Sequence, residues 1–193
     1  MRRSITLAIT FTLLLGTAAL AANPEQLQKL LDTSTCPGCD LSEANLYNLN
    51  LQGANLSNAN LNSAGLQGST LEFANLTNTN FQRANLALVK LRAATLQGAN
   101  LSKASLYGAD IGNADLKSAN LQQANLQGAD LTGANLTGAN LQQADLQKAD
   151  LTEADLTGAD LQKANLLRAK LKGAKLDGAK LKGVILPDGS TPR

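Results

Sequence analysis

Two cysteines form the motif whose residue types and spacing could most readily support chemistry. They lie in Cys36-Pro37-Gly38-Cys39, and the chain has no other cysteine. A redox role for such a pair requires a strand-helix-strand context of the thioredoxin kind, which this sequence does not show. The residues themselves therefore favour a structural disulfide or two unpaired thiols.

Three carboxylates form a second candidate. Asp110, Asp130 and Asp150 are equally spaced along the sequence, and Lys90 and Lys170 continue the same spacing on either side. If the fold places such residues side by side, they form either a cation site or a solvated column flanked by its own lysines. The chain has no histidine or tryptophan, so the commonest general base and transition-metal ligand are missing. We predict no cofactor, no metal site and no catalytic residues.

A period of five decides how these side chains are positioned. Large apolar residues occupy position 41 and every fifth position through 186, and alanine stands two residues before most of them. In a helix, successive leucines would advance by roughly 140°, so they would form no buried stripe. A straight strand would send alternate leucines to opposite faces. We therefore expect a chain that turns once per unit, with Ala and Leu inward, Asn or Asp outward, and glycine favoured at the corners because it accepts a positive φ.

Units such as ANLQGANL and ADLTGANL resemble the consensus of the pentapeptide repeat family. The resemblance implies an all-β solenoid, a right-handed quadrilateral β-helix with four units in each coil. It covers residues 39–188, and 189–193 form a short tail. The family resemblance also implies that Cys36 and Cys39 are joined as a disulfide bracket.

The N-terminal residues predict export and a cap. Residues 1–21 read as a cleavable signal peptide, with Arg2 and Arg3 before an apolar run, although a permanent membrane anchor is the alternative. Residues 22–38 should hold a capping helix followed by the cysteine motif. Its expected signals are an N-cap at Asn23, proline at the first helical position, a capping box completed by Gln26, and an apolar stripe of Leu27, Leu30 and Leu31.

Outward positions four units apart should form columns along the rod. Asn at 60, 80, 100, 120 and 140 forms one such column, and Gln at 82, 122, 142 and 162 forms another, with Gln123 and Gln143 beside it. Stacked amides of this kind can hydrogen-bond along the rod, which favours a role in solubility and ladder stability. Apolar residues in outward positions are rare. We therefore regard Phe73, Ala87, Leu88 and Tyr107 as candidates for partner binding, against the alternative that single exposed apolar groups have no role.

Charge is distributed unevenly along the chain. Residues 22–162 hold 7 basic and 13 acidic residues, whereas 163–193 hold 8 basic and 2 acidic residues. The basic tail could meet an acidic partner, an anionic membrane surface or the acidic end of another copy. It consists of Lys163, Arg168, Lys170, Lys172, Lys175, Lys180 and Lys182.

These patterns favour a non-catalytic exported rod, a scaffold or binding module with an unknown protein partner, in the periplasm or thylakoid lumen. We expect a monomer or a weak end-to-end oligomer, no nucleic-acid partner and no stable membrane insertion after signal cleavage. The alternative, implied by the resemblance, is a gyrase-inhibiting mimic of DNA. The signal peptide and the neutral charge of the chain after residue 21 argue against it, because inhibitors of that kind are strongly acidic.

Overall fold

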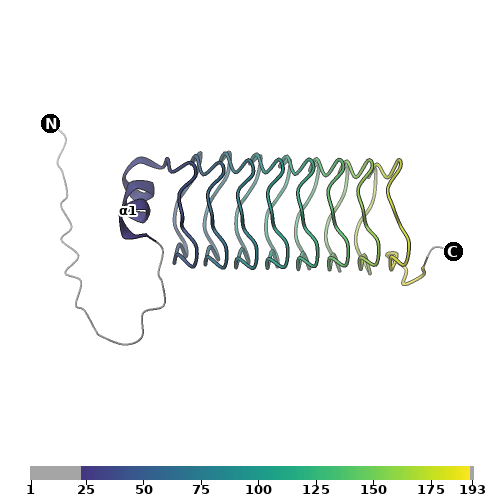
Figure 1. The fold of residues 1–193 in the computed structure, drawn as a ribbon. Helices are drawn as coiled ribbons and strands as arrows, with labels where there is room; N and C mark the ends of the chain where they lie inside the picture. The colour runs from purple at the N-terminus through teal and green to yellow at the C-terminus, as the bar shows by residue number, and fades with distance from the viewer. Residues whose placement is uncertain (1–22, 192–193) are drawn as a thin grey trace, which may run out of the picture.

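The computed structural model describes residues 23–191 and shows a straight four-sided rod (Figure 1). The rod is a right-handed quadrilateral β-helix, and one short helix, α1 (Pro24–Thr33), lies at its N-terminal end. The predicted signal peptide lies outside the described residues. Helix α1 is the one helix within residues 23–191, and the coils contain parallel bridges of single residues rather than longer strands.

The bridges confirm the predicted coil of four units. Every fifth residue from Thr35 to Asn165 forms a parallel bridge with the residue four units further along, as Thr35 does with Asn55 and Asn165 with Ile185. Each five-residue unit therefore forms one side of the rod. Because the chain turns after every unit, a period of five keeps all the leucines on the inside.

The interior is a column of leucine and alanine. Leu131 and Leu136 are fully buried, as are Ala134 and Ala139 beside them. Ser69 and Thr79 replace alanine at two inward positions, and each hydroxyl donates a hydrogen bond to the carbonyl of a leucine in the preceding coil. The column is thus filled by side chains, and its few polar groups are paired.

Every corner from position 38 to position 183 uses a left-handed backbone. Glycine occupies many corners as expected, for example Gly133 with φ of 66°. However, residues with side chains adopt the same conformation, including Leu88 with φ of 57° and Phe73 with φ of 59°. A left-handed residue other than glycine costs about 1–2 kcal/mol, so a large apolar side chain at a corner adds strain that glycine would avoid.

The unit around Leu131 shows how the backbone is satisfied. The N–H groups of Leu131 and Gly133 donate to the next coil, at 2.7 and 2.9 Å, and that of Asp130 donates to the preceding coil at 2.9 Å. The N–H of Ala134 closes the corner by donating to the carbonyl of Leu131. The remaining N–H, of Thr132, donates to Oδ1 of Asp130 at 2.9 Å.

That last bond explains why Asn or Asp precedes most leucines. The side-chain oxygen accepts the N–H two residues later, which would otherwise lack a partner at the corner. The same bond recurs from Ser42 to Asp40 and from Gln162 to Asp160. The outward residue is therefore a structural part of each unit as well as a surface group.

Candidate functional site

Helix α1 covers the N-terminal end of the rod. The Asn23 side chain accepts hydrogen bonds from the N–H groups of Glu25 and Gln26, so the predicted N-cap is present. The predicted capping box is wrong, because the Gln26 side chain accepts the N–H of Asp40 in the first coil instead. Leu30 is fully buried, whereas Leu31 is 48% exposed on the outer face and does not belong to the stripe.

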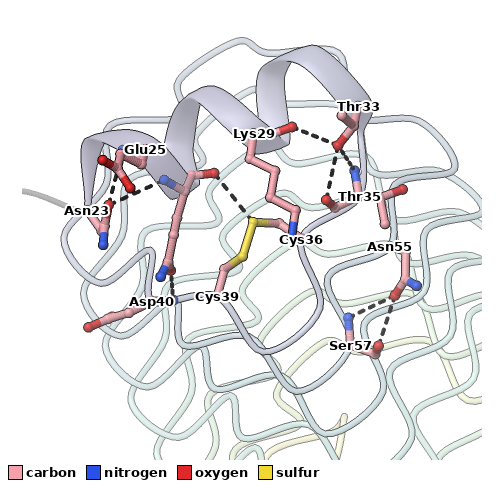
Figure 2. Close-up of a disulfide and its surroundings, with 11 residues drawn as sticks. Asn23, Glu25, Lys29, Thr33, Thr35, Cys36, Cys39, Asp40, Asn55 and Ser57 are labelled. Carbon is pink, nitrogen blue, oxygen red and sulfur yellow. Dashed lines mark hydrogen bonds between the residues drawn. A yellow bond between two sulfur atoms is a disulfide. The ribbon is translucent and has the colours of Figure 1, made fainter.

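A disulfide joins Cys36 and Cys39 directly beneath α1 (Figure 2). Both cysteines are buried, and the sulfur of Cys36 lies 3.4 Å from the carbonyl oxygen of Gln26. A disulfide sulfur carries no proton, so this is a contact rather than a donated hydrogen bond. The bridge therefore packs between the helix and the first coil, and helix α1 limits its access to another thiol.

The aspartate column is neutralised by basic side chains of the chain itself. Bridges place Lys90, Asp110, Asp130, Asp150 and Lys170 in one column, as predicted. Lys90 and Lys170 flank the three aspartates as expected, but the described groups that form ion pairs with these aspartates are Arg92 and Lys170 rather than Lys90.

The Arg92 side chain extends along the rod axis beside the aspartate column, because the residue that follows it in the next coil is Gly112, which has no side chain. The Nε of Arg92 is 3.3 Å from Asp110 and its Nη2 is 3.4 Å from Asp130. A Cβ at Gly112 would lie 3.0 Å from the guanidinium carbon. Gly112 thus leaves room for Arg92 to reach two coils, and residues 23–191 contain no cluster of carboxylates arranged to hold a metal ion.

Three lysines of the basic tail also bind aspartates of the preceding coil. Lys170 lies 2.8 Å from Asp150, and equivalent pairs join Lys175 to Asp155 at 3.6 Å and Lys180 to Asp160 at 3.5 Å. The Lys170 hydrogen bond, with further donors from Thr152, lowers the pKa of Asp150 to about 2. The Asp150 carboxylate in turn raises the pKa of Lys170. These lysines therefore contribute less free positive charge than the sequence indicated.

The predicted asparagine ladder is present. Each amide from Asn60 to Asn140 donates to the side-chain oxygen one coil earlier, and the first of these bonds runs from Asn60 to Asp40 at 2.9 Å. The glutamine ladder is present only in part. Nε2 of Gln123 donates to Oε1 of Gln143 one coil later at 2.8 Å, whereas Gln142 donates to Asp160 at 2.9 Å. Both arrangements connect coils and contribute to the rod.

The structure brings Ala87, Leu88 and Tyr107 together on one corner. Leu88 and Tyr107 are 54% and 53% exposed, and the N–H of Leu88 donates to the carbonyl of Tyr107 at 2.9 Å. A Cβ at Gly108 would lie 2.9 Å from Cδ2 of Leu88, so the leucine lies flat over this glycine. We call Ala87, Leu88 and Tyr107 the Leu88 patch.

Two further aromatic residues lie outside the Leu88 patch. Phe73 is 63% exposed but occupies a different corner of the coil, so the structure does not join it to Leu88. Tyr47 was missed by the sequence analysis. It is 47% exposed on the same corner as Tyr107, three coils earlier, and its ring lies over Gly65. The signal was available, because the spacing of the two tyrosines is a whole number of coils.

Basic side chains lie on the corner before the Leu88 patch and on the side after it. Arg83 and Lys103 occupy the corners that lead into it, and Lys90 follows it on the next side. All three are exposed, and none of them takes part in an ion pair with another described residue. An apolar corner with free cations beside it favours a partner surface that presents an apolar group among carboxylates.

The described part of the chain offers a filled core rather than an enclosed active site. Its surface hollows are shallow, and one of them is lined by Tyr47, Asn48 and Gln67. Within residues 23–191 we find no helix with the length and hydropathy that a bilayer span requires.

Comparison with known proteins identifies the repeat. A family model described as pentapeptide repeats matches in 8 copies, over residues 39–72, 64–89, 84–123, 114–152 and 149–186. A search of curated proteins finds no match.

Similar solved structures include two from cyanobacteria and one from a plant. HetL from Nostoc, a pentapeptide repeat protein involved in heterocyst differentiation regulation, is 29% identical, with 88% of this chain and 99% of that chain covered and a TM-score of 0.34. A pentapeptide repeat protein from Cyanothece is 24% identical, with 84% and 97% covered and a TM-score of 0.46. One from the Arabidopsis thaliana thylakoid lumen is 25% identical, with 66% and 68% covered and a TM-score of 0.36.

Proposed function

This chain belongs to the pentapeptide repeat family, and from that premise we propose that it is a non-catalytic exported rod that binds a protein partner through the Leu88 patch. Proteins of the family are typically structural or binding proteins rather than enzymes. The observation that carries the proposal is the pair of large apolar side chains, Leu88 and Tyr107, exposed in adjacent coils on one corner. The basic side chains beside them give the expected partner its chemistry, an apolar group framed by acidic residues.

The strain at this corner supports a binding role. Leu88 has a left-handed backbone, which suits glycine better. The other residues on this corner between positions 48 and 168 are glycine or polar: Asn48, Gly68, Gly108, Gly128, Lys148 and Arg168. An exposed leucine adds little stability there, since it is 54% exposed and packs mainly over Gly108. A residue that costs conformational energy without filling the core is better explained by a contact outside the chain.

We place the protein in the periplasm or thylakoid lumen, on the support of the N-terminal signal pattern and the two cysteines. Gyrase inhibition is a weaker alternative. A mimic of DNA needs a continuous acidic surface, whereas Arg92 and Lys170 neutralise the aspartate column of this rod.

Site-specific photocrosslinking in the source cell tests the proposal. A photoreactive residue at position 88 should yield a specific adduct, and the adduct should disappear when Tyr107→Ser is added. The matched control is a photoreactive residue at Gly128, which lies on the same corner two coils later. Equal adducts from positions 88 and 128, or an adduct from 88 that survives Tyr107→Ser, would contradict a partner site at the Leu88 patch.

A further inference from the structure

A shallow hollow on the rod surface contains the ring of Tyr47. The hollow has a volume of about 260 Å³ and is lined by Tyr47, Asn48 and Gln67. Tyr47 is 47% exposed, and its ring lies over Gly65 of the next coil, because a Cβ at Gly65 would be 3.0 Å from Cζ and 3.1 Å from Cε1 of the tyrosine. The ring therefore extends along the rod and keeps part of its surface open to solvent.

Glycine at position 65 serves this ring rather than the backbone. The outward positions form every fifth residue from 40 to 185, and Gly65 is the only glycine among them. Its φ lies outside the left-handed region, so the backbone at this position would accept other residues. The missing side chain leaves the space that the Tyr47 ring occupies.

The glycine also leaves hydrogen-bonding groups of the hollow free. In most units an outward Asn or Asp accepts the N–H two residues later, but the N–H of Gln67 has no acceptor in the described part of the chain. The side-chain amide of Asn48 and the hydroxyl of Tyr47 form no hydrogen bond with another described residue. Gln67 uses only its Oε1, which accepts from Asn85 at 3.4 Å. The hollow thus presents both donors and acceptors, and none of its three lining residues is charged.

Tyr107, on the same corner three coils later, provides a comparison. Gln127 takes the place of Gln67 there. The N–H of Gln127 donates to Asn125 at 3.0 Å, and its Nε2 donates to Asp145 at 2.6 Å. The glutamine beside the later tyrosine is therefore used within the rod, whereas the corresponding donors of Gln67 remain free for a ligand.

We propose that this hollow binds a neutral sugar ring. The face of an aromatic ring packs against the C–H groups of a pyranose, and amides suit its hydroxyl groups because each hydroxyl both donates and accepts. The sugar lies on the exposed surface of Tyr47, where its hydroxyls accept from the N–H of Gln67 and bond to the amide of Asn48. The uncharged lining favours a neutral sugar over an anionic ligand.

The size and position of the hollow define the ligand further. Its volume is below the roughly 300–1,000 Å³ of pockets that bury a drug-sized ligand, so we expect it to hold one ring of a saccharide. Because the hollow is open, we expect millimolar affinity. It lies two coils before the Leu88 patch, and its ligand does not depend on the partner proposed there.

Tyrosine fluorescence tests the site directly. The chain has two tyrosines and no tryptophan, so the Tyr107→Phe variant keeps Tyr47 as its only tyrosine. We expect at least one of the disaccharides maltose, cellobiose and N,N′-diacetylchitobiose to change the emission of this variant in a saturable manner. Sorbitol, which has the hydroxyl groups but no ring, is the control and should have no effect. Emission that responds to none of these disaccharides, or equally to sorbitol, would refute the sugar site.

Gly65→Asn, made in the same Tyr107→Phe background, should remove the site and keep the fold. The same column already holds asparagine, at positions 45, 85 and 125. The new Cβ would displace the Tyr47 ring, and the new side chain would accept the N–H of Gln67. We expect the affinity for the sugar to fall by about tenfold or more, with an unchanged or higher melting temperature.

Ser105→Asn is the matched control for this substitution. It restores asparagine in the same column two coils later, away from the hollow, and should leave the affinity unchanged. A Gly65→Asn variant that binds the sugar as tightly as its parent, or an equal loss of affinity in the Ser105→Asn variant, would overturn the inference.

Discussion

Replacing Leu131 with aspartate tests the inward assignment of the repeat. The side chain of Leu131 is fully buried, and its N–H and carbonyl are both used in hydrogen bonds, so the backbone has little freedom to turn the residue outward. Losing a buried leucine costs about 2–5 kcal/mol, and a carboxyl group without a partner in an apolar column adds to this. We therefore expect a loss of at least about 4 kcal/mol.

The control is aspartate at the adjacent position, Thr132, which lies half-buried on the outside. There the new carboxylate would approach Asp130, at a cost of about 1 kcal/mol for two like charges about 4 Å apart in water. At about 2–4 °C per kcal/mol for a chain of this size, Leu131→Asp should lower the melting temperature by at least about 8 °C and Thr132→Asp by about 2–4 °C. Thermal unfolding followed by circular dichroism measures both, and equal shifts would refute the inward assignment.

Three further predictions follow from the outer columns and the N-terminal bracket. Asn100→Ala should destabilise the rod by about 1–3 kcal/mol in urea unfolding, because the N–H of Ser102 loses its acceptor, whereas Asn100→Asp keeps that acceptor and should cost less. Because the folded-state pKa of Asp150 is lowered from 3.8 to about 2, its contribution to stability is present above about pH 4 and lost as the pH falls toward 2. Asp150→Asn should therefore reduce the melting temperature at neutral pH more than at pH 2, and an equal reduction would contradict this account. A thiol reagent applied without reductant should leave Cys36 and Cys39 of the native protein unlabelled, and labelling of both would show that the bracket is absent in the cell.

An uninterrupted period of five predicted a chain that turns once per unit, and the resemblance to the pentapeptide repeat family supplied the right-handed coil of four units. Together they also placed the Leu88 patch and the aspartate column, since positions four units apart lie side by side once four units form a coil. The role of Arg92 could not be foreseen from its column alone, because its side chain reaches Asp110 and Asp130 only across the space that Gly112 leaves.

Errors at the N-terminal end have a similar cause. Gln26 has the spacing of a capping box, but the N–H of Asp40 competes for its side chain once the helix lies on the first coil.

The outward Asn and Asp were predicted to form the surface, yet their role in accepting a corner N–H was missed. Asx turns have a known sequence signal, an Asn or Asp two positions before the N–H that it accepts, and it is present in most units.

The central claim is that regular units build the rod and that departures from the repeat confer specificity. The most direct test compares partner binding by two altered chains, both first shown to be folded by circular dichroism. One chain lacks residues 121–140, a complete regular coil, which preserves the register. The other carries Leu88→Gly and Tyr107→Gln, residues that this corner already uses at positions 68 and 127. We predict that the shortened chain keeps the crosslinked partner and that the double variant loses it. Loss of the partner by the shortened chain together with its retention by the double variant would contradict the account.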